Sequence, residues 1–204
     1  MAAFRAPALA LTTLLLAGCL PAPRPGAPEP AGRAVAEAAW DARQEQLRAI
    51  DEFQLQGRLA VKGGGLSGAL RWRQQGARFK LRLAGPLGAG ALLLEGDDAL
   101  VSIKGADIDL VTAEPEQVLA ARTGWLLPLR ALRWWVLGLP APQTEARVQL
   151  DPQGRALGLS QLGWELVFSD YRAGEPGLPG RIEARRGPAQ ATVIVESLHL
   201  GPAP

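Results

Sequence analysis

The chain has 204 residues, of which 48% are hydrophobic and 21% are charged. Its 22 basic and 20 acidic side chains leave a formal net charge of +2, and a chain so balanced lacks the electrostatic footprint of a nucleic-acid-binding protein. One cysteine and one histidine exclude an internal disulfide framework and a zinc site built from several such side chains.

The N-terminal segment has the pattern of a secretory signal peptide. Arg5 is its only charge before an apolar run from Ala6 to Ala17, which is shorter than the roughly 20 residues that a membrane-spanning helix needs. The sequence Leu16-Ala17-Gly18-Cys19 resembles the lipobox of bacterial lipoproteins, in which the cysteine thiol accepts a diacylglycerol. We therefore expect residues 1–18 to be a cleaved signal peptide and Cys19 to be lipidated. The alternative is an ordinary signal peptide with an incidental cysteine.

A proline-rich stretch follows the lipidation motif. The residue after Cys19 is Leu20 rather than the Asp that holds many Gram-negative lipoproteins in the inner membrane, so we expect export to the outer membrane. Residues 19–34 contain five prolines, and such a segment prefers extended polyproline II at about 3.1 Å per residue. It is predicted to be a linker ahead of a single folded domain, residues 35–204.

The hydrophobic pattern of the domain begins with a helix and changes to strands. Trp40, Leu47 and Ile50 fall near one face of a helix predicted over residues 35–50. From Phe53 the apolar residues alternate with polar ones, which predicts half-buried antiparallel strands. The six strands expected here cover residues 53–62, 66–73, 78–83, 91–95, 100–104 and 108–112.

The middle of the chain interrupts the strands with two short helices. They are predicted over residues 114–122, where Pro115 lies in the first turn, and over residues 129–137, which Gly138 and Pro140 close. Five more strands are expected at residues 146–150, 156–162, 164–171, 181–185 and 190–198. The fold class is mostly β, with one antiparallel sheet of about ten or eleven strands that must curl around the apolar helices.

The sequence offers no constellation for catalysis. Gly63 to Gly68 match G-x-G-x-x-G, but a strand pattern follows where a dinucleotide-binding loop needs a helix, so these glycines predict a hairpin turn. His199 is expected on the surface, and Asp97-Asp98 in a solvated turn. We expect no catalytic residue, no metal and no cofactor, and hence no enzyme.

Two apolar segments are more informative, and each has two interpretations. Leu87 lies in a loop of glycine and proline, where it either folds back onto the core or projects for insertion into a membrane or a partner. The stretch from Leu126 to Pro140 is almost entirely apolar. It either plugs the curled sheet or forms one wall of a cavity for acyl chains.

Several short pieces together resemble the LolB family of outer-membrane lipoprotein receptors. In chain order these pieces are Gly57-Arg58-Leu59-Ala60-Val61, Ser67-Gly68 with Trp72, Gly85-Pro86-Leu87-Gly88, Leu127-Pro128-Leu129 with Leu132-Arg133-x-Trp135-x-Leu137-Gly138-x-Pro140, and Gln161-x-Gly163-Trp164 with Tyr171 and Pro179. The stretch from Pro128 to Pro140 is the most specific of them.

The resemblance implies a fold, a site and partners. The fold is an incomplete antiparallel β-barrel whose helices cap a hydrophobic cavity, and the function is to accept lipoproteins from the periplasmic carrier LolA and insert them into the outer membrane. The loop Gly85, Pro86, Leu87 and Gly88 would insert into the membrane. We expect a lipid-anchored monomer on the periplasmic leaflet of the outer membrane, with no nucleic-acid partner. The residues expected to line the acyl-chain cavity are Leu59, Val61, Leu70, Trp72, Leu81, Leu83, Leu132, Trp135, Val136 and Trp164.

Three other functions remain open at this point. The chain also fits a LolA-like carrier, although a soluble carrier is disfavoured by Cys19. It also fits a general lipid-binding lipoprotein, or a structural envelope lipoprotein whose sheet is packed solid.

Overall fold

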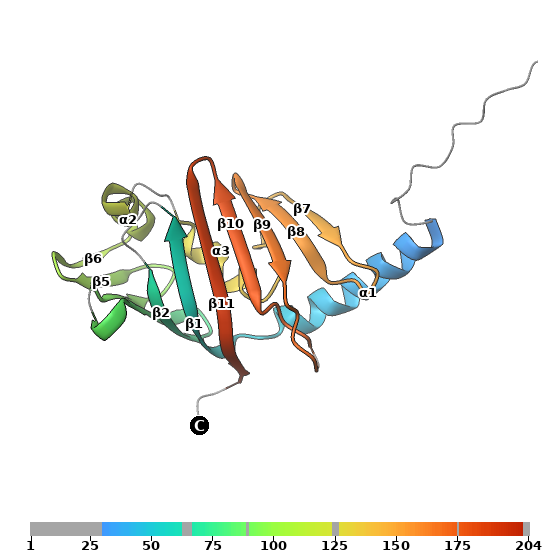
Figure 1. Cartoon of the computed structure of the whole chain (residues 1–204), viewed down its shortest axis with the longest axis horizontal. Coiled ribbons are helices and arrows are strands. Elements are labelled where there is room, and N and C mark those ends of the chain that lie inside the picture. Colours follow the sequence, from blue (N-terminus) through green and yellow to red (C-terminus); the bar gives the residue numbers. More distant parts are fainter. Residues whose placement is uncertain (1–29, 63–66, 89, 124–126, 175, 202–204) are drawn as a thin grey trace, which may run out of the picture.

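The computed structural model describes residues 30–62, 67–88, 90–123, 127–174 and 176–201. The predicted signal peptide, the lipidation site Cys19 and most of the predicted linker lie outside these residues, as do three of the glycines of the predicted hairpin turn. Within them the chain forms one antiparallel sheet of 11 strands with three α-helices (Figure 1). The predicted fold class is therefore confirmed.

The helices and strands follow the predicted order, with ends that differ by a few residues. The helices are α1 (Pro30–Arg48), α2 (Pro115–Thr123) and α3 (Leu129–Trp135), and a single turn of 3-10 helix, η1, covers Pro86–Gly88. The strands are β1 (Glu52–Lys62), β2 (Gly68–Gln75), β3 (Arg78–Ala84), β4 (Leu92–Gly96), β5 (Val101–Gly105), β6 (Ile108–Thr112), β7 (Ala146–Leu150), β8 (Ala156–Gln161), β9 (Trp164–Ser169), β10 (Arg181–Arg186) and β11 (Ala189–Leu200).

The sheet consists of two meanders that lie side by side and are joined through their edge strands β1 and β11. Its strand order is β6-β5-β4-β3-β2-β1-β11-β10-β9-β8-β7, so the first six strands and the last five each pair with their sequence neighbours. The pairing of β1 with β11 connects the halves. Among the described residues β6 and β7 form the two edges and do not pair with each other, so the curled sheet is an incomplete barrel.

The joint between the two halves depends on a glycine. The β1–β11 ladder runs from Phe53 opposite Leu200 to Lys62 opposite Gln190, and its register shifts at Gly57. A Cβ at Gly57 would lie 2.2 Å from the carbonyl oxygen of Ile194, closer than any side chain tolerates. The close approach of the two backbones therefore requires glycine at this position.

Helix α1 begins earlier than the sequence predicts. It starts at Pro30 rather than at Val35, so residues 30–34 are helical and the predicted linker is wrong over its last five residues. The reason is that proline is tolerated in the first helical turn, where a backbone N–H has no partner within the helix. Trp40 and Leu47, predicted on one face, are both buried.

The helices lie at different places along the sheet. Helix α1 lies against β7 at one end (Figure 1). Helix α2 buries Leu119 in a small cluster with Leu94 of β4 and Ile103 of β5. Helix α3 packs Ala131 and Trp135 into the main core between these ends. No helix among the described residues is long and apolar enough to cross a bilayer.

Candidate functional site

An apolar cavity lies between the inner face of the sheet and helix α3. Its volume is about 120 Å³, and every described residue that lines it is hydrophobic. The ten residues expected from the sequence to line a cavity all do so. Ten further lining residues were not predicted: Leu92, Leu94, Leu119, Leu127, Leu129, Leu166, Ile182, Ala184, Ala191 and Val193.

The alternation of residues along β2 and β3 produces one wall of this cavity. Leu70 lies directly opposite Leu83, and Trp72 lies opposite Leu81. Because successive side chains of a strand point to opposite faces, these four side chains gather on the inner face, while the residues between them face outward. The period of two in the sequence therefore gives a continuous apolar wall.

Two tryptophans meet at the other side of the cavity. The rings of Trp135 of α3 and Trp164 of β9 have centroids 6.4 Å apart at an interplanar angle of 60°. The indole Nε1 of Trp164 is buried and has no hydrogen-bond partner among the described residues. Apart from this N–H group, the wall offers only apolar surface.

A buried amide holds the end of α3 against the sheet. Gln161 is 3% exposed, and its Oε1 accepts hydrogen bonds from Trp135 Nε1 and from the backbone N–H of Ala141, both at 2.9 Å. Its Nε2 donates to the carbonyl oxygen of Ala141 and to Thr144 Oγ1, both at 2.8 Å. Such a fully paired amide fixes the position of a cavity wall, since leaving any of these groups unpaired inside the protein is costly.

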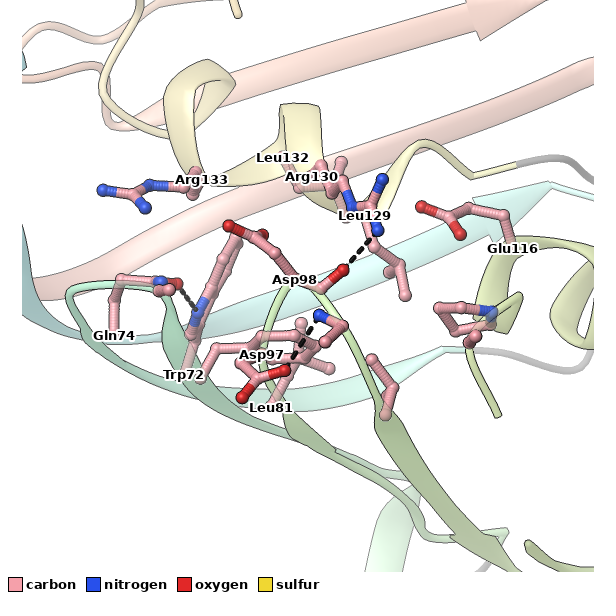
Figure 2. A pocket seen from close by; sticks show the side chains of 16 residues that line it. Trp72, Gln74, Leu81, Asp97, Asp98, Glu116, Leu129, Arg130, Leu132 and Arg133 are labelled. Carbon is pink, nitrogen blue, oxygen red and sulfur yellow. Dashed lines mark hydrogen bonds between the residues drawn. The ribbon is translucent and has the colours of Figure 1, made fainter. Parts of the chain in front are cut away.

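Figure 2 shows a second, more polar pocket, which is lined by residues of α3 and of the turn at Asp97 and Asp98. Arg133 Nη1 donates to the carbonyl oxygen of Gly76 at 3.0 Å, and the Arg130 guanidinium donates to the carbonyl oxygen of Asp98. Gln74 accepts from Trp72 Nε1 at 3.0 Å and donates to the Gly76 carbonyl oxygen at 2.8 Å. The two arginine bonds tie α3 to two turns of the sheet, and the two bonds of Gln74 hold the Trp72 indole beside one of these turns.

The two pockets share a thin wall. Trp72, Leu81, Leu129 and Leu132 line both of them, so these four side chains separate the polar pocket from the apolar cavity. The turn after β4 is closed by its own carboxylate. The backbone N–H groups of Leu100 and Ala99 donate to Asp97 Oδ1, and these bonds lower the pKa of Asp97.

The predicted insertion loop connects β3 to β4. Residues Pro86–Gly88 form η1, whose backbone closes with a 3.0 Å hydrogen bond from Gly88 N–H to the carbonyl oxygen of Gly85. Pro86 and Gly88 are exposed. The side chain of Leu87, which the sequence predicts either to pack on the core or to project, lies outside the described part of the structure. His199 is exposed, as predicted.

Comparison with known proteins places the chain in one family. Residues 51–197 match the family described as "Outer membrane lipoprotein LolB". The chain is 35% identical over 196 residues to the outer-membrane lipoprotein LolB of Nitrosococcus oceani, a match that covers 94% of this chain and 95% of that protein. It is 36% identical to the protein of the same name from Stutzerimonas stutzeri, with 94% and 92% covered.

A solved structure supports the fold independently. A LolA superfamily protein from Nitrosomonas europaea superposes with a TM-score of 0.52 at 9% sequence identity, covering 83% of this chain and 94% of that one. Together with the open eleven-stranded sheet, the sequence matches show that the chain belongs to the LolB family of outer-membrane lipoproteins.

Proposed function

We propose that this protein accepts lipoproteins from the periplasmic carrier LolA and inserts them into the outer membrane, and that the cavity under α3 binds the acyl chains of the cargo. The observation that carries the proposal is the cavity itself, whose described lining residues are all hydrophobic and lie within the residues that match the family. The proposed role contains no covalent step, so it requires no catalytic residue, metal, cofactor or nucleotide.

The driving force for transfer is the hydrophobic effect. Each buried methylene is stabilised by about 0.8 kcal/mol relative to water, both in the carrier and here. Moving an acyl chain from one cavity to the other therefore costs little, provided that the chain does not cross water. The direction of transfer is set by the difference in affinity between the two cavities, and finally by the bilayer.

The cavity must widen to admit its cargo. Its volume of about 120 Å³ is below the roughly 300–1,000 Å³ of ordinary ligand pockets. Continuous backbone ladders hold the strands, whereas α3 is a seven-residue helix held at the polar pocket by two arginine side chains and at its end by Gln161. We therefore assign the moving wall to the part of α3 that the two arginines hold, while Gln161 keeps the C-terminal end of the helix in place.

The loop from Gly85 to Gly88 is assigned to the final step. It joins two strands of the cavity wall, and its exposed Pro86 and Gly88 agree with a loop that meets the bilayer. In this proposal Leu87 enters the lipid and helps the cargo to leave the cavity. The protein acts as a monomer held by the lipid on Cys19.

The test is a transfer assay without nucleotide. LolA carrying a labelled lipoprotein is mixed with this chain from Leu20 onward, which lacks the anchor, and the label is followed after separation of the two proteins. We expect the label to move to this chain. A label that stays on a demonstrably active carrier would overturn the receptor role, and a general lipid-binding or structural envelope role would then account for the fold better.

A cavity-filling variant makes the same assay specific. Apolar cavities of about 150 Å³ hold benzene, so the ring introduced by Ala184→Phe should fill most of this one, since Ala184 lines it. Acceptance should fall strongly in that variant. The matched control is Ala60→Phe on the exposed face of β1, which should accept cargo normally, and equal loss in both variants would contradict the assignment of the cavity.

A further inference from the structure

Two arginines lie directly opposite each other on the outer face of the sheet. In the β2–β3 ladder Arg71 pairs with Arg82, and both are exposed. Like charges at directly opposed positions destabilise an antiparallel pair. Solvent screens this repulsion between exposed groups, and an anion bound between the two side chains would remove it.

The neighbours of this pair do not supply that anion. The next like-charged pair on the same two strands, Arg73 with Lys80, is relieved because Lys80 Nζ lies 2.9 Å from Glu95 Oε2. Arg71 and Arg82 have Gln56 and Leu93 as their lateral partners on the adjoining strands. Within the described part of the chain neither guanidinium forms an ion pair or a hydrogen bond with another residue.

The pair borders a hollow beside the loop η1. The hollow has a volume of about 300 Å³, and the other described residues of its lining are four small ones. Ala69 and Ala84 lie opposite each other between the arginines and the loop, and they leave both guanidinium groups open to a ligand above the sheet. The residues of the hollow are Ala69, Arg71, Arg82, Ala84, Gly85 and Gly88.

We propose that this hollow binds the phosphate of an anionic phospholipid in the membrane leaflet on which the protein is anchored. Guanidinium groups bind phosphate oxygens in a bidentate manner, and two of them side by side can donate to both non-bridging oxygens of one phosphodiester. The protein is an outer-membrane lipoprotein, so a lipid surface is always within reach. Gly85 and Gly88 belong both to the hollow and to the loop. The inference rests on the proposed insertion role of that loop, and it adds a headgroup site that orients the loop toward the bilayer.

The experiment uses the full acylated protein on vesicles. Because the lipid occupies the chain's single cysteine, Gln56→Cys on the strand beside Arg71 provides one free thiol for a spin label outside the hollow. The accessibility of the label to a water-soluble relaxation agent is compared on vesicles of phosphatidylglycerol with phosphatidylcholine and on vesicles of phosphatidylcholine alone. We expect shielding only where phosphatidylglycerol is present.

The variants distinguish binding at the arginine pair from a general effect of positive charge on attraction to the membrane. Arg71→Gln with Arg82→Gln should lower the ratio of shielded to exposed label about 30-fold, since each arginine near an anionic surface contributes about 1 kcal/mol. The control Arg73→Gln with Arg147→Gln removes the same charge from exposed positions outside the hollow and should retain most of the shielding. Arg71→Lys with Arg82→Lys keeps the charge and should retain part of it.

Three results would overturn the proposal: equal shielding on both vesicle types, equal loss in the paired variant and its control, or shielding induced by soluble glycerol phosphate on neutral vesicles. Transfer from LolA is measured on the same samples. Normal transfer without shielding refutes the headgroup site alone. Shielding without transfer leaves the headgroup site standing and refutes the receptor role.

Discussion

Replacing Gln161 by leucine should destabilise the protein far more than the loss of one side-chain contact suggests. The leucine is close in shape to the amide, but it leaves two buried N–H groups unpaired, those of the Trp135 indole and of the Ala141 backbone. The carbonyl oxygen of Ala141 loses its bond from Gln161 and keeps only the 3.4 Å bond from Thr144 Oγ1. Each unpaired group costs about 1–3 kcal/mol, so we expect a loss of about 2–6 kcal/mol. That is a large part of the roughly 5–15 kcal/mol by which a domain is stable.

Urea unfolding followed by tryptophan fluorescence measures this loss. With a denaturant slope of about 2 kcal/mol per molar, the midpoint should fall by about 2 M. The control is Gln75→Leu on the exposed end of β2, which should change stability by less than about 0.5 kcal/mol. If both variants shift equally little, water replaces the amide and the clamp on α3 does not exist.

A second substitution tests the assigned partner. Trp135→Phe removes the indole N–H that donates a hydrogen bond to Gln161. The substitution should therefore lower the free energy of unfolding less in the Gln161→Leu background than in the unsubstituted protein. We expect a coupling energy of about 1 kcal/mol or more between the two positions. Additive effects would refute the direct bond as the source of the stabilisation.

Three further predictions concern the loop, the polar pocket and a partly buried tyrosine. Leu87→Glu should stall insertion into vesicles while acceptance from LolA continues, and an equal loss of both steps would contradict a separate role for the loop. Arg133→Ala removes the bond from α3 to Gly76 and should speed the entry of an apolar fluorescent probe into the cavity, whereas an unchanged rate would exclude α3 as the moving wall. Burial raises the pKa of Tyr171 to about 12, and since this is the chain's one tyrosine, its near-ultraviolet absorbance titrates alone. Because this pKa lies above the unfolded value of about 10, the folded state holds the proton more tightly, so its contribution to stability is complete below about pH 10 and disappears as the pH rises toward 12. Titration near pH 10 in the folded protein would contradict this.

The strand part of the cavity was predictable because its signal is local. Leu70, Trp72, Leu81 and Leu83 alternate with charged or small residues, so one face of β2 and β3 had to be apolar whichever strands paired with it. By contrast, Leu92 and Leu94 lie in a run of three leucines. Such a run carries no period of two, so its inward face was set only by pairing with β3.

The pairing of β1 with β11, which joins the two halves of the sheet, could not be predicted from the hydrophobic pattern. Ala191 and Val193 line the cavity because β11 pairs with β1, and a contact between strands so far apart in the chain leaves no local signature. The same holds for Gln161, whose partners Trp135 and Ala141 are 26 and 20 residues away. In the sequence, Gln161 is one residue of a motif that resembles the LolB family. Only the structure shows that it holds the end of α3.

The pair Arg71 and Arg82 shows what the combination of sequence and structure adds. In the sequence the two residues belong to ordinary polar faces of adjacent strands. Their direct opposition depends on the register of the β2–β3 hairpin, and a shift by one residue would turn the side chains to opposite faces of the sheet. Only the register makes them a site.

Photo-crosslinking of the cargo's acyl chains tests the central claim most directly. An aliphatic diazirine amino acid, close to leucine in size, is placed at Leu132, which lines the cavity, or at Val167 on β9, which is 53% exposed, and each protein receives from LolA a lipoprotein labelled in its acyl chains. The account predicts that light joins the label to the protein with the probe at Leu132 and not to the one with the probe at Val167. Crosslinking at Val167 with none at Leu132 would show that acyl chains bind elsewhere, and it would contradict the cavity as the binding site.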